Sequence, residues 1–136
     1  MKVLYDHQIF ASQVYGGISR FFSEVGAHIP ATPGMEAGVL CPLYVNAYLD
    51  TPSALKVHGK RVHRLPRAAI AMRTLNAALS PWWREVRAGV DVYHETYFSR
   101  IDIAPKCPAR VVTVHDMVHE KFGDAFPALD RTRDAK

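Results

Sequence analysis

The chain has 136 residues, 49% of them hydrophobic and 22% charged, which is enough to bury a core without support from disulfides or a metal. Seventeen Lys and Arg against thirteen Asp and Glu give a net charge of +4, too small to indicate a nucleic-acid partner. Cys41 and Cys107 form no CxxC pair, as expected in a reducing compartment. Asp6 interrupts any apolar leader, and no run of about 18 apolar residues occurs, so we expect one cytoplasmic domain over residues 1–136.

The first forty residues predict a strand, a helix and a second strand. Residues 3–5 are apolar and are followed by Asp6, as in a short strand buried on both faces of a parallel sheet. Residues 17–29 carry apolar side chains at helical spacing, with polar residues between them. Pro30 ends this helix, and the turn residues that follow lead into a strand over 36–40. The apolar face of the helix comprises Ile18, Phe21, Phe22, Val25 and Ile29.

The middle of the chain has a less regular pattern. Residues 41–64 show no sustained period, and both a short helix and a short strand are compatible with them. From Pro66 the spacing predicts a helix, and Ser80-Pro81 supplies an N-cap and a first-turn proline for a second helical segment that ends at Gly89. The first helix would bury Ala69, Met72, Leu75 and Leu79, and the second would be anchored by Trp82, Trp83 and Val86.

Two further apolar runs, 90–93 and 110–114, predict the last strands. The order of strands and helices is typical of an α/β fold with a parallel sheet, in which ligand sites gather beyond the carboxyl ends of the strands. Three of these ends carry titratable residues, namely Asp6-His7, His94-Glu95 and His115-Asp116.

A glycine pair, Gly16 and Gly17, precedes the first predicted helix. Glycine lets the backbone approach a ligand closely, and the N–H groups of a helix start attract phosphate. Arg20 lies one turn further along, where a cation can help to hold an anion. Ordinary turn chemistry for the glycines and a solvated helix face for Arg20 are the alternatives.

The stretch VVTVHDMVHE delivers four titratable side chains within six residues: His115, Asp116, His119 and Glu120. Histidine exchanges a proton near neutral pH or donates to a developing negative charge, and a neighbouring carboxylate can fix its tautomer. The stretch is therefore a candidate site. The alternative is that Asp116 only forms local hydrogen bonds with the backbone at the end of the strand and that the histidines lie on the surface.

Two other interpretations start from single residue types. His115 and His119 have the spacing of a metal pair, to which His94 could add a ligand, but Asp116 stands where HExxH has glutamate, and we expect no metal. Residues 51–84 contain seven Lys or Arg and no Asp or Glu, which suits an anionic membrane surface. We interpret this segment as a solvated face, because Met72, Leu75 and Leu79 are expected in the core.

Three motifs together carry a resemblance to a known family. YDHQIFASQVYGGISRFFSEV, DVYHETYF and VVTVHDMVHEKF occur in the order and at the spacing of the amino-terminal domain of group 1, or family 4, glycosyltransferases, which the chain resembles. The resemblance implies one Rossmann-like half of a GT-B enzyme, which transfers a sugar from a nucleotide-sugar to a glycan or lipid-linked acceptor with retention. It implies no cofactor and no metal. The cysteines and the interrupted leader predict a cytoplasmic location, and the basic segment leaves peripheral contact at the inner membrane face as an option.

By the same resemblance, Gly16, Gly17 and Arg20 would bind the donor's diphosphate, and His115, with Asp116 beside it, would be catalytic near the transferred sugar. His94, Glu95, His119 and Glu120 would line the acceptor side.

The resemblance covers only the acceptor-side domain. We therefore expect a fragment with little activity alone, which pairs with a donor-binding domain or with itself through an exposed sheet edge. Two alternatives remain: a non-catalytic carbohydrate- or protein-binding module, and a histidine-based metal hydrolase.

Overall fold

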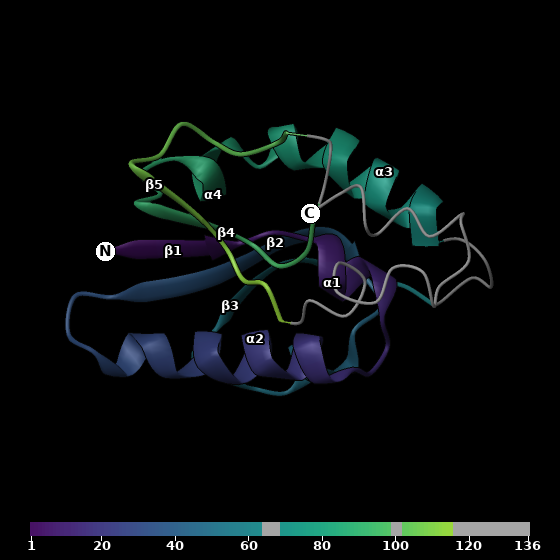
Figure 1. The fold of residues 1–136 in the computed structure, drawn as a ribbon, viewed down its shortest axis with the longest axis horizontal. Coiled ribbons are helices and arrows are strands. Elements are labelled where there is room, and N and C mark those ends of the chain that lie inside the picture. Colours follow the sequence, from purple (N-terminus) through teal and green to yellow (C-terminus); the bar gives the residue numbers. More distant parts are fainter. Residues whose placement is uncertain (64–68, 99–101, 116–136) are drawn as a thin grey trace, which may run out of the picture.

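A computed structural model describes residues 1–63, 69–98 and 102–115, and it shows a five-stranded, all-parallel sheet with helices on its faces (Figure 1). The predicted α/β fold class is confirmed. The strands are β1 (Lys2–Tyr5), β2 (Glu36–Tyr44), β3 (Lys56–Arg61), β4 (Val92–Glu95) and β5 (Ala109–Val112). The helices are α1 (Gln8–Ser12), α2 (Gly17–His28), α3 (Ala69–Leu79) and α4 (Arg84–Arg87), with 3-10 turns η1 (Ile29–Ala31), η2 (Ala47–Asp50) and η3 (Ser80–Trp82).

The sheet begins in its centre and grows outward in both directions, in the order β3-β2-β1-β4-β5. Val3 of β1 lies opposite Ala37 of β2 on one side and Val92 of β4 on the other. The strand order reverses between β1 and β4, which is the point where parallel α/β sheets bind ligands. β5 forms one edge, where Val111 and Val112 are 40% and 46% exposed.

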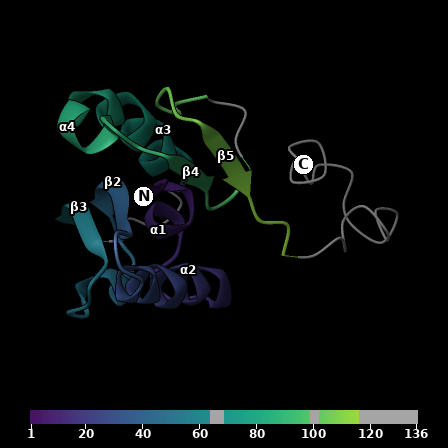
Figure 2. The same ribbon diagram turned by 90° about the vertical axis from the view of Figure 1, so that its left-hand side faces the viewer.

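The helices cover the two faces of the sheet unequally. Figure 2 shows α2 on one face and α3 with α4 on the other. Side chains alternate along each strand, so Tyr5 packs with Phe22 on the α2 side, whereas Leu4 and Tyr93 join a second cluster that Trp83 borders. β1, β2 and β4 contribute side chains to both clusters.

Helix α2 forms where predicted, and Ile18, Phe22 and Ile29 of its predicted apolar face pack on the core, but the other two residues of that face do not. Phe21 and Val25, expected in the core, are 45% and 39% exposed, whereas Ser19, Phe22 and Gly26 are buried. A Cβ added at Gly26 would lie 2.9 Å from Leu55 Cδ1 and 3.0 Å from Tyr5 Cε2. Small residues therefore let the helix approach the sheet closely, and this approach decides its buried face.

The segment from α3 to α4 also differs from prediction in which side chains it buries. Met72 is buried, but Leu75 is 49% and Trp82 is 81% exposed, so neither belongs to the core. The Ser80 hydroxyl does not cap a helix start. It donates instead to the carbonyl of Asn76 at 2.7 Å, and η3 continues directly from α3.

Residues 41–64, which the sequence left open, contain the end of β2, then η2 and β3. The pairing of β2 with β3 shifts between Leu40 and Leu43, and the buried side chain of Asn76 holds this irregularity. Asn76 Oδ1 accepts from the Leu43 amide at 2.8 Å, and its Nδ2 donates to the Leu43 carbonyl at 2.8 Å. Gly59, at φ +159°, leaves room for the Cys41 carbonyl, which a Cβ there would meet at 1.7 Å.

Within the described part of the chain, every helix is too short or too polar to cross a bilayer.

Candidate functional site

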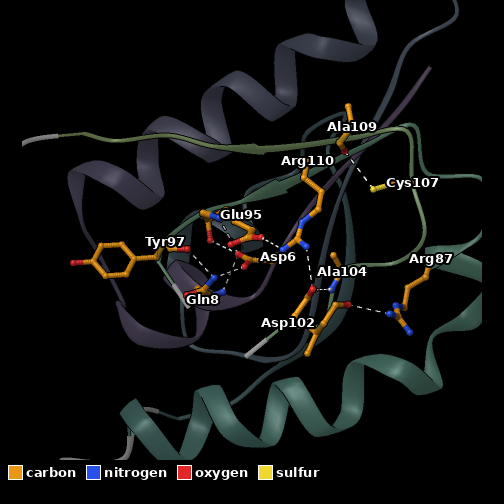
Figure 3. A network of polar contacts seen from close by, with 12 residues as sticks. Asp6, Gln8, Arg87, Glu95, Tyr97, Asp102, Ala104, Cys107, Ala109 and Arg110 are labelled. Atoms are coloured by element: carbon orange, nitrogen blue, oxygen red, sulfur yellow. Dashed lines mark hydrogen bonds and ion pairs between the residues drawn. The ribbon is translucent and has the colours of Figure 1, made fainter. Parts of the chain in front are cut away.

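The reversal point between β1 and β4 is closed by a buried carboxylate. Asp6, 2% exposed, accepts hydrogen bonds from the Thr96 amide at 3.0 Å and from the Gln8 side-chain amide at 2.6 Å (Figure 3). The Thr96 hydroxyl donates to the same carboxylate at 2.5 Å. Asp6 therefore joins two strand ends and is not presented to solvent, although the sequence places it at a strand end typical of ligand sites.

Arg73 extends this network from α3. Its Nη2 donates to Gln8 Oε1 at 2.8 Å and to the Phe98 carbonyl at 3.0 Å. His7 lies beside it at 4% exposure, and its Nδ1 has no hydrogen-bond partner among the described residues. Burial lowers the pKa of His7, while the nearby Asp6 charge opposes this shift. The imidazole of His7 is thus an interior side chain whose charged form burial disfavours.

His94 lies on the α2 side of β4, between aromatic rings. Its ring centroid is 5.2 Å from that of Tyr5 and 5.1 Å from that of Phe22. Its Nε2 is 2.9 Å from Thr113 Oγ1, which follows β5. Burial lowers the pKa of His94; the Asp6 charge raises it and His115 lowers it further. His94 is therefore a packed, partly buried imidazole whose charged form burial disfavours, and its Nε2 lies within hydrogen-bond distance of the residue that follows β5.

His115 shares only Phe22 of these two aromatic contacts with His94, and it is exposed. Its ring meets Phe21 and Phe22 edge-on, with centroid distances of 5.4 and 5.6 Å. Phe22 therefore contacts both His94 of β4 and His115, which follows β5. An exposed imidazole held by ring contacts can donate a hydrogen bond or exchange a proton with a bound molecule.

The two glycines at the start of α2 have different surroundings. A Cβ at Gly16 would lie 1.9 Å from Gln13 Oε1, so this glycine makes room for the Gln13 side chain. Nothing among the described residues lies within 4 Å of the place that a Gly17 Cβ would take. Gly17 and Phe21 are four residues apart and lie on one face of α2. His115, which contacts Phe21, is consequently on the same side of the helix as Gly17.

Arg20 lies on the exposed surface of α2, where its Nε is 3.9 Å from Glu24 Oε1. Both side chains are more than half exposed, at 68% and 61%, so this ion pair contributes little to stability. Arg20 can therefore turn toward an anion near Gly17 without disturbing a buried contact.

Glu95 is not part of the histidine group, because neighbouring strand residues point to opposite faces of a sheet. On the far face from His94, Glu95 Oε1 pairs with Arg110 Nη2 at 2.5 Å, and Arg110 Nη1 pairs with Asp102 at 3.0 Å. Figure 3 shows this ion-pair group beside Asp6. The other predicted site residues, Asp116, His119 and Glu120, lie outside the described residues.

An aromatic pair that sequence reasoning did not single out stands at the same edge. Tyr15, directly before the glycines, is 69% exposed, and its ring meets Tyr48 of η2 edge-on at 5.7 Å. Exposed tyrosine rings offer flat apolar surface with a polar tip. The signal in the sequence was a large aromatic residue in a turn, where polar or small residues are usual.

Residues 1–63, 69–98 and 102–115 contain no group of three or more His, Cys, Asp or Glu side chains arranged to hold a metal ion. No family model, curated protein or solved structure matches the chain.

Proposed function

We propose that this chain is the acceptor-side, Rossmann-like domain of a glycosyltransferase, which transfers a sugar from a nucleotide-sugar to a glycan or lipid-linked acceptor. The observation that carries the proposal is the position of Gly17 and His115 on one side of α2, at the carboxyl edge of the parallel sheet. Gly17, His115 and also His94 belong to the three sequence motifs that resemble family 4 glycosyltransferases.

In this proposal, the amino-terminal end of α2 stabilises the negative charge of the leaving group. Breaking the bond to a nucleoside diphosphate builds negative charge on the phosphates as the sugar takes on oxocarbenium character. The first N–H groups of α2 have no partner within the helix and lie at its positive end. With open space at Gly17, the backbone can approach a phosphate closely, and Arg20 adds a mobile positive charge.

His115 would hydrogen-bond the transferred sugar, and His94 would position it. Since His94 packs on Phe22, which also contacts His115, it helps to fix the ring contacts that hold His115. Asp116, His119 and Glu120 complete the proposed acceptor side. A donor-binding domain, in this chain's partner or elsewhere in its polypeptide, would supply the nucleotide contacts and further cations.

A second candidate function is a glycan-binding module without transfer chemistry. The exposed ring of Tyr15, oriented by Tyr48, favours it, because aromatic faces stack on the apolar faces of sugar rings. The two functions differ in their need for phosphate contacts. A module of this kind would bind oligosaccharides and ignore a diphosphate.

The test is a titration of the ¹⁵N-labelled chain with inorganic pyrophosphate and with UDP, followed by amide chemical shifts. We expect the largest shifts at Gly17 and the next residues of α2. Gly17→Pro removes one N–H at a position where proline suits a helix start, and Gly17→Ala keeps the N–H as its matched control. Weaker binding by the proline variant alone would support the proposal. Shifts confined to other regions, or equal binding by both variants, would refute the phosphate role.

A further inference from the structure

The three residues that follow β5 carry the proposed catalytic histidine, and the chain here leaves the sheet toward α2 (Figure 1). They are Thr113, Val114 and His115. The pairing of β4 with β5 ends one residue earlier, at Glu95 and Val112. Val114 is 49% exposed, and His115 is exposed as well. Where the imidazole lies therefore depends largely on side-chain contacts.

Thr113 is the partly buried residue of this segment, and it makes the segment's one side-chain hydrogen bond to the described part of the chain. Its Oγ1 lies 2.9 Å from His94 Nε2. The strand register explains this contact, because Val111 lies opposite His94 and side chains two residues apart in an extended chain face the same side. Thr113 therefore reaches His94 from the end of the neighbouring strand.

His94, the partner of Thr113, is itself fixed within the fold. It belongs to β4, lies opposite Tyr5 in the register, and packs between the rings of Tyr5 and Phe22 at centroid distances of 5.2 and 5.1 Å. Both of these aromatic residues are buried in the core. The hydrogen bond therefore ties the segment after β5 to a side chain that has little freedom to move.

His115 has ring contacts with α2 but no hydrogen bond to a described residue. Its imidazole meets Phe21 and Phe22 edge-on, at centroid distances of 5.4 and 5.6 Å, and Phe21 is itself 45% exposed. Ring contacts of this kind contribute about 0.5–1.5 kcal/mol each, which is a weak restraint on an exposed side chain. Because Thr113 is only two residues away, its bond to His94 limits where the imidazole can lie.

We propose that Thr113, through its hydrogen bond to His94, is a positioning residue that holds the imidazole of His115 against α2. The role of His115 as a hydrogen-bond partner of the transferred sugar rests on the proposed function, whereas the placement of its ring can be measured without it. A group that acts on a substrate must be held within about 0.5 Å of its productive position. Loss of the Thr113 hydroxyl should therefore misplace the imidazole while the fold is kept.

The test is nuclear magnetic resonance of the full chain, read at the ring protons of His115. In the wild type we expect nuclear Overhauser effects from these protons to the rings of Phe21 and Phe22. Thr113→Val keeps the shape of the side chain but leaves His94 Nε2 without its partner, so these effects should fall by about half or more. The His115 chemical shifts should move toward those of a free imidazole. Thr113→Ser keeps the hydroxyl and should preserve both signals.

Thr74→Val is the matched control, because it removes a threonine hydroxyl that donates to the Ile70 carbonyl at 3.0 Å on α3, on the other face of the sheet. Urea denaturation checks that each variant stays folded. Unchanged His115 signals in Thr113→Val, or an equal loss in Thr74→Val or Thr113→Ser, would overturn the proposal.

Pyrophosphate, added to the same samples, separates this inference from the proposed function. A response at the Gly17 amide with unchanged His115 signals in Thr113→Val would refute the positioning role alone. If the wild type gives no response at Gly17, the phosphate site is refuted, and the role of Thr113 in sugar transfer is refuted with it. A loss of the His115 contacts in Thr113→Val, with an undiminished response at Gly17, is the result that supports both.

Discussion

Asp6 and Thr96 are 90 residues apart in the chain, and one carboxylate oxygen of Asp6 accepts from both the amide and the hydroxyl of Thr96. The Thr96 hydroxyl in turn accepts from the Ile9 amide at 3.2 Å. These bonds join the ends of β1 and β4 to the start of α1, at the point where the strand order reverses. The site edge is therefore held from beneath by a buried polar contact.

We expect Thr96→Val to lower the free energy of unfolding by about 2–3 kcal/mol, because a bond to a charged acceptor is lost and the Ile9 amide loses its partner. Urea denaturation measures the change. In a double-mutant cycle with Asp6→Asn, the two losses should not add, since the residues share one network. If the two losses of unfolding free energy simply add, the contact between Asp6 and Thr96 contributes nothing beyond the separate effects of the two side chains.

Gly26→Ala should destabilise the fold by about 1–3 kcal/mol, since the added methyl group would crowd Leu55 and the ring of Tyr5. The matched control is Gly17→Ala, where the methyl group meets open space and alanine favours the helix by about 0.5–1 kcal/mol. Thermal or urea unfolding of both variants provides the comparison. Equal effects would mean that α2 can move away from the sheet without cost.

Asn76→Ala is expected to cost about 2–4 kcal/mol, because the Leu43 amide and carbonyl lose their partner where β2 is irregular. Asn76→Asp should be nearly as harmful, since it keeps the acceptor but loses the donor to the Leu43 and Met72 carbonyls. Chemical denaturation tests both. A small loss in either variant would show that water replaces the amide.

Acidification should destabilise the fold through His7 and His94. Burial sets the pKa of each below its ordinary value of 6.5, so below that pH the unfolded chain binds more protons than the folded one. The histidine contribution is complete above about 6.5 and is lost as pH falls toward the folded-state pKa values.

Unfolding free energies measured on both sides of pH 6.5 test this expectation. His7→Asn and His94→Gln should each flatten the dependence, and the slope left in the double variant belongs partly to His58, whose pKa burial also lowers. A slope unchanged in the double variant would contradict the assignment.

In the proposed transferase, acting together with a donor-binding domain, His115→Ala should reduce sugar transfer by about 100-fold, because the proposed hydrogen bond to the reacting sugar would be lost. The ring is exposed, so the free energy of unfolding should change by less than about 1 kcal/mol. His28→Ala, at the far end of α2, is the control. Unchanged turnover in His115→Ala would reject the catalytic role.

Local patterns in the sequence suffice for α2 and for β1, β2, β4 and β5, since an apolar run or a helical period is complete within a few residues, but they left β3 open. They do not suffice for the buried face of α2, which depends on how closely Gly26 approaches Tyr5 and Leu55. The irregularity of β2 could not be predicted from local sequence either, because Asn76 stabilises it from a helix far along the chain.

The candidate site shows the same division. The parallel order of β4 and β5 predicts that His94 and His115 lie near each other, and their shared contact with Phe22 agrees with it. Because adjacent residues of a strand point to opposite faces of the sheet, the sequence alone could have placed Glu95 and His94 on opposite faces. The phosphate and acceptor roles of these residues stay predictions.

The pairing of Val3 with Val92 has a consequence for synthesis on the ribosome. β1 leaves the exit tunnel first, yet it is the middle strand and keeps one side unsatisfied until β4 has been translated. During that interval a nascent β1 and β2 pair presents an open hydrogen-bonding edge, at the stage when exposed strand edges invite misassembly.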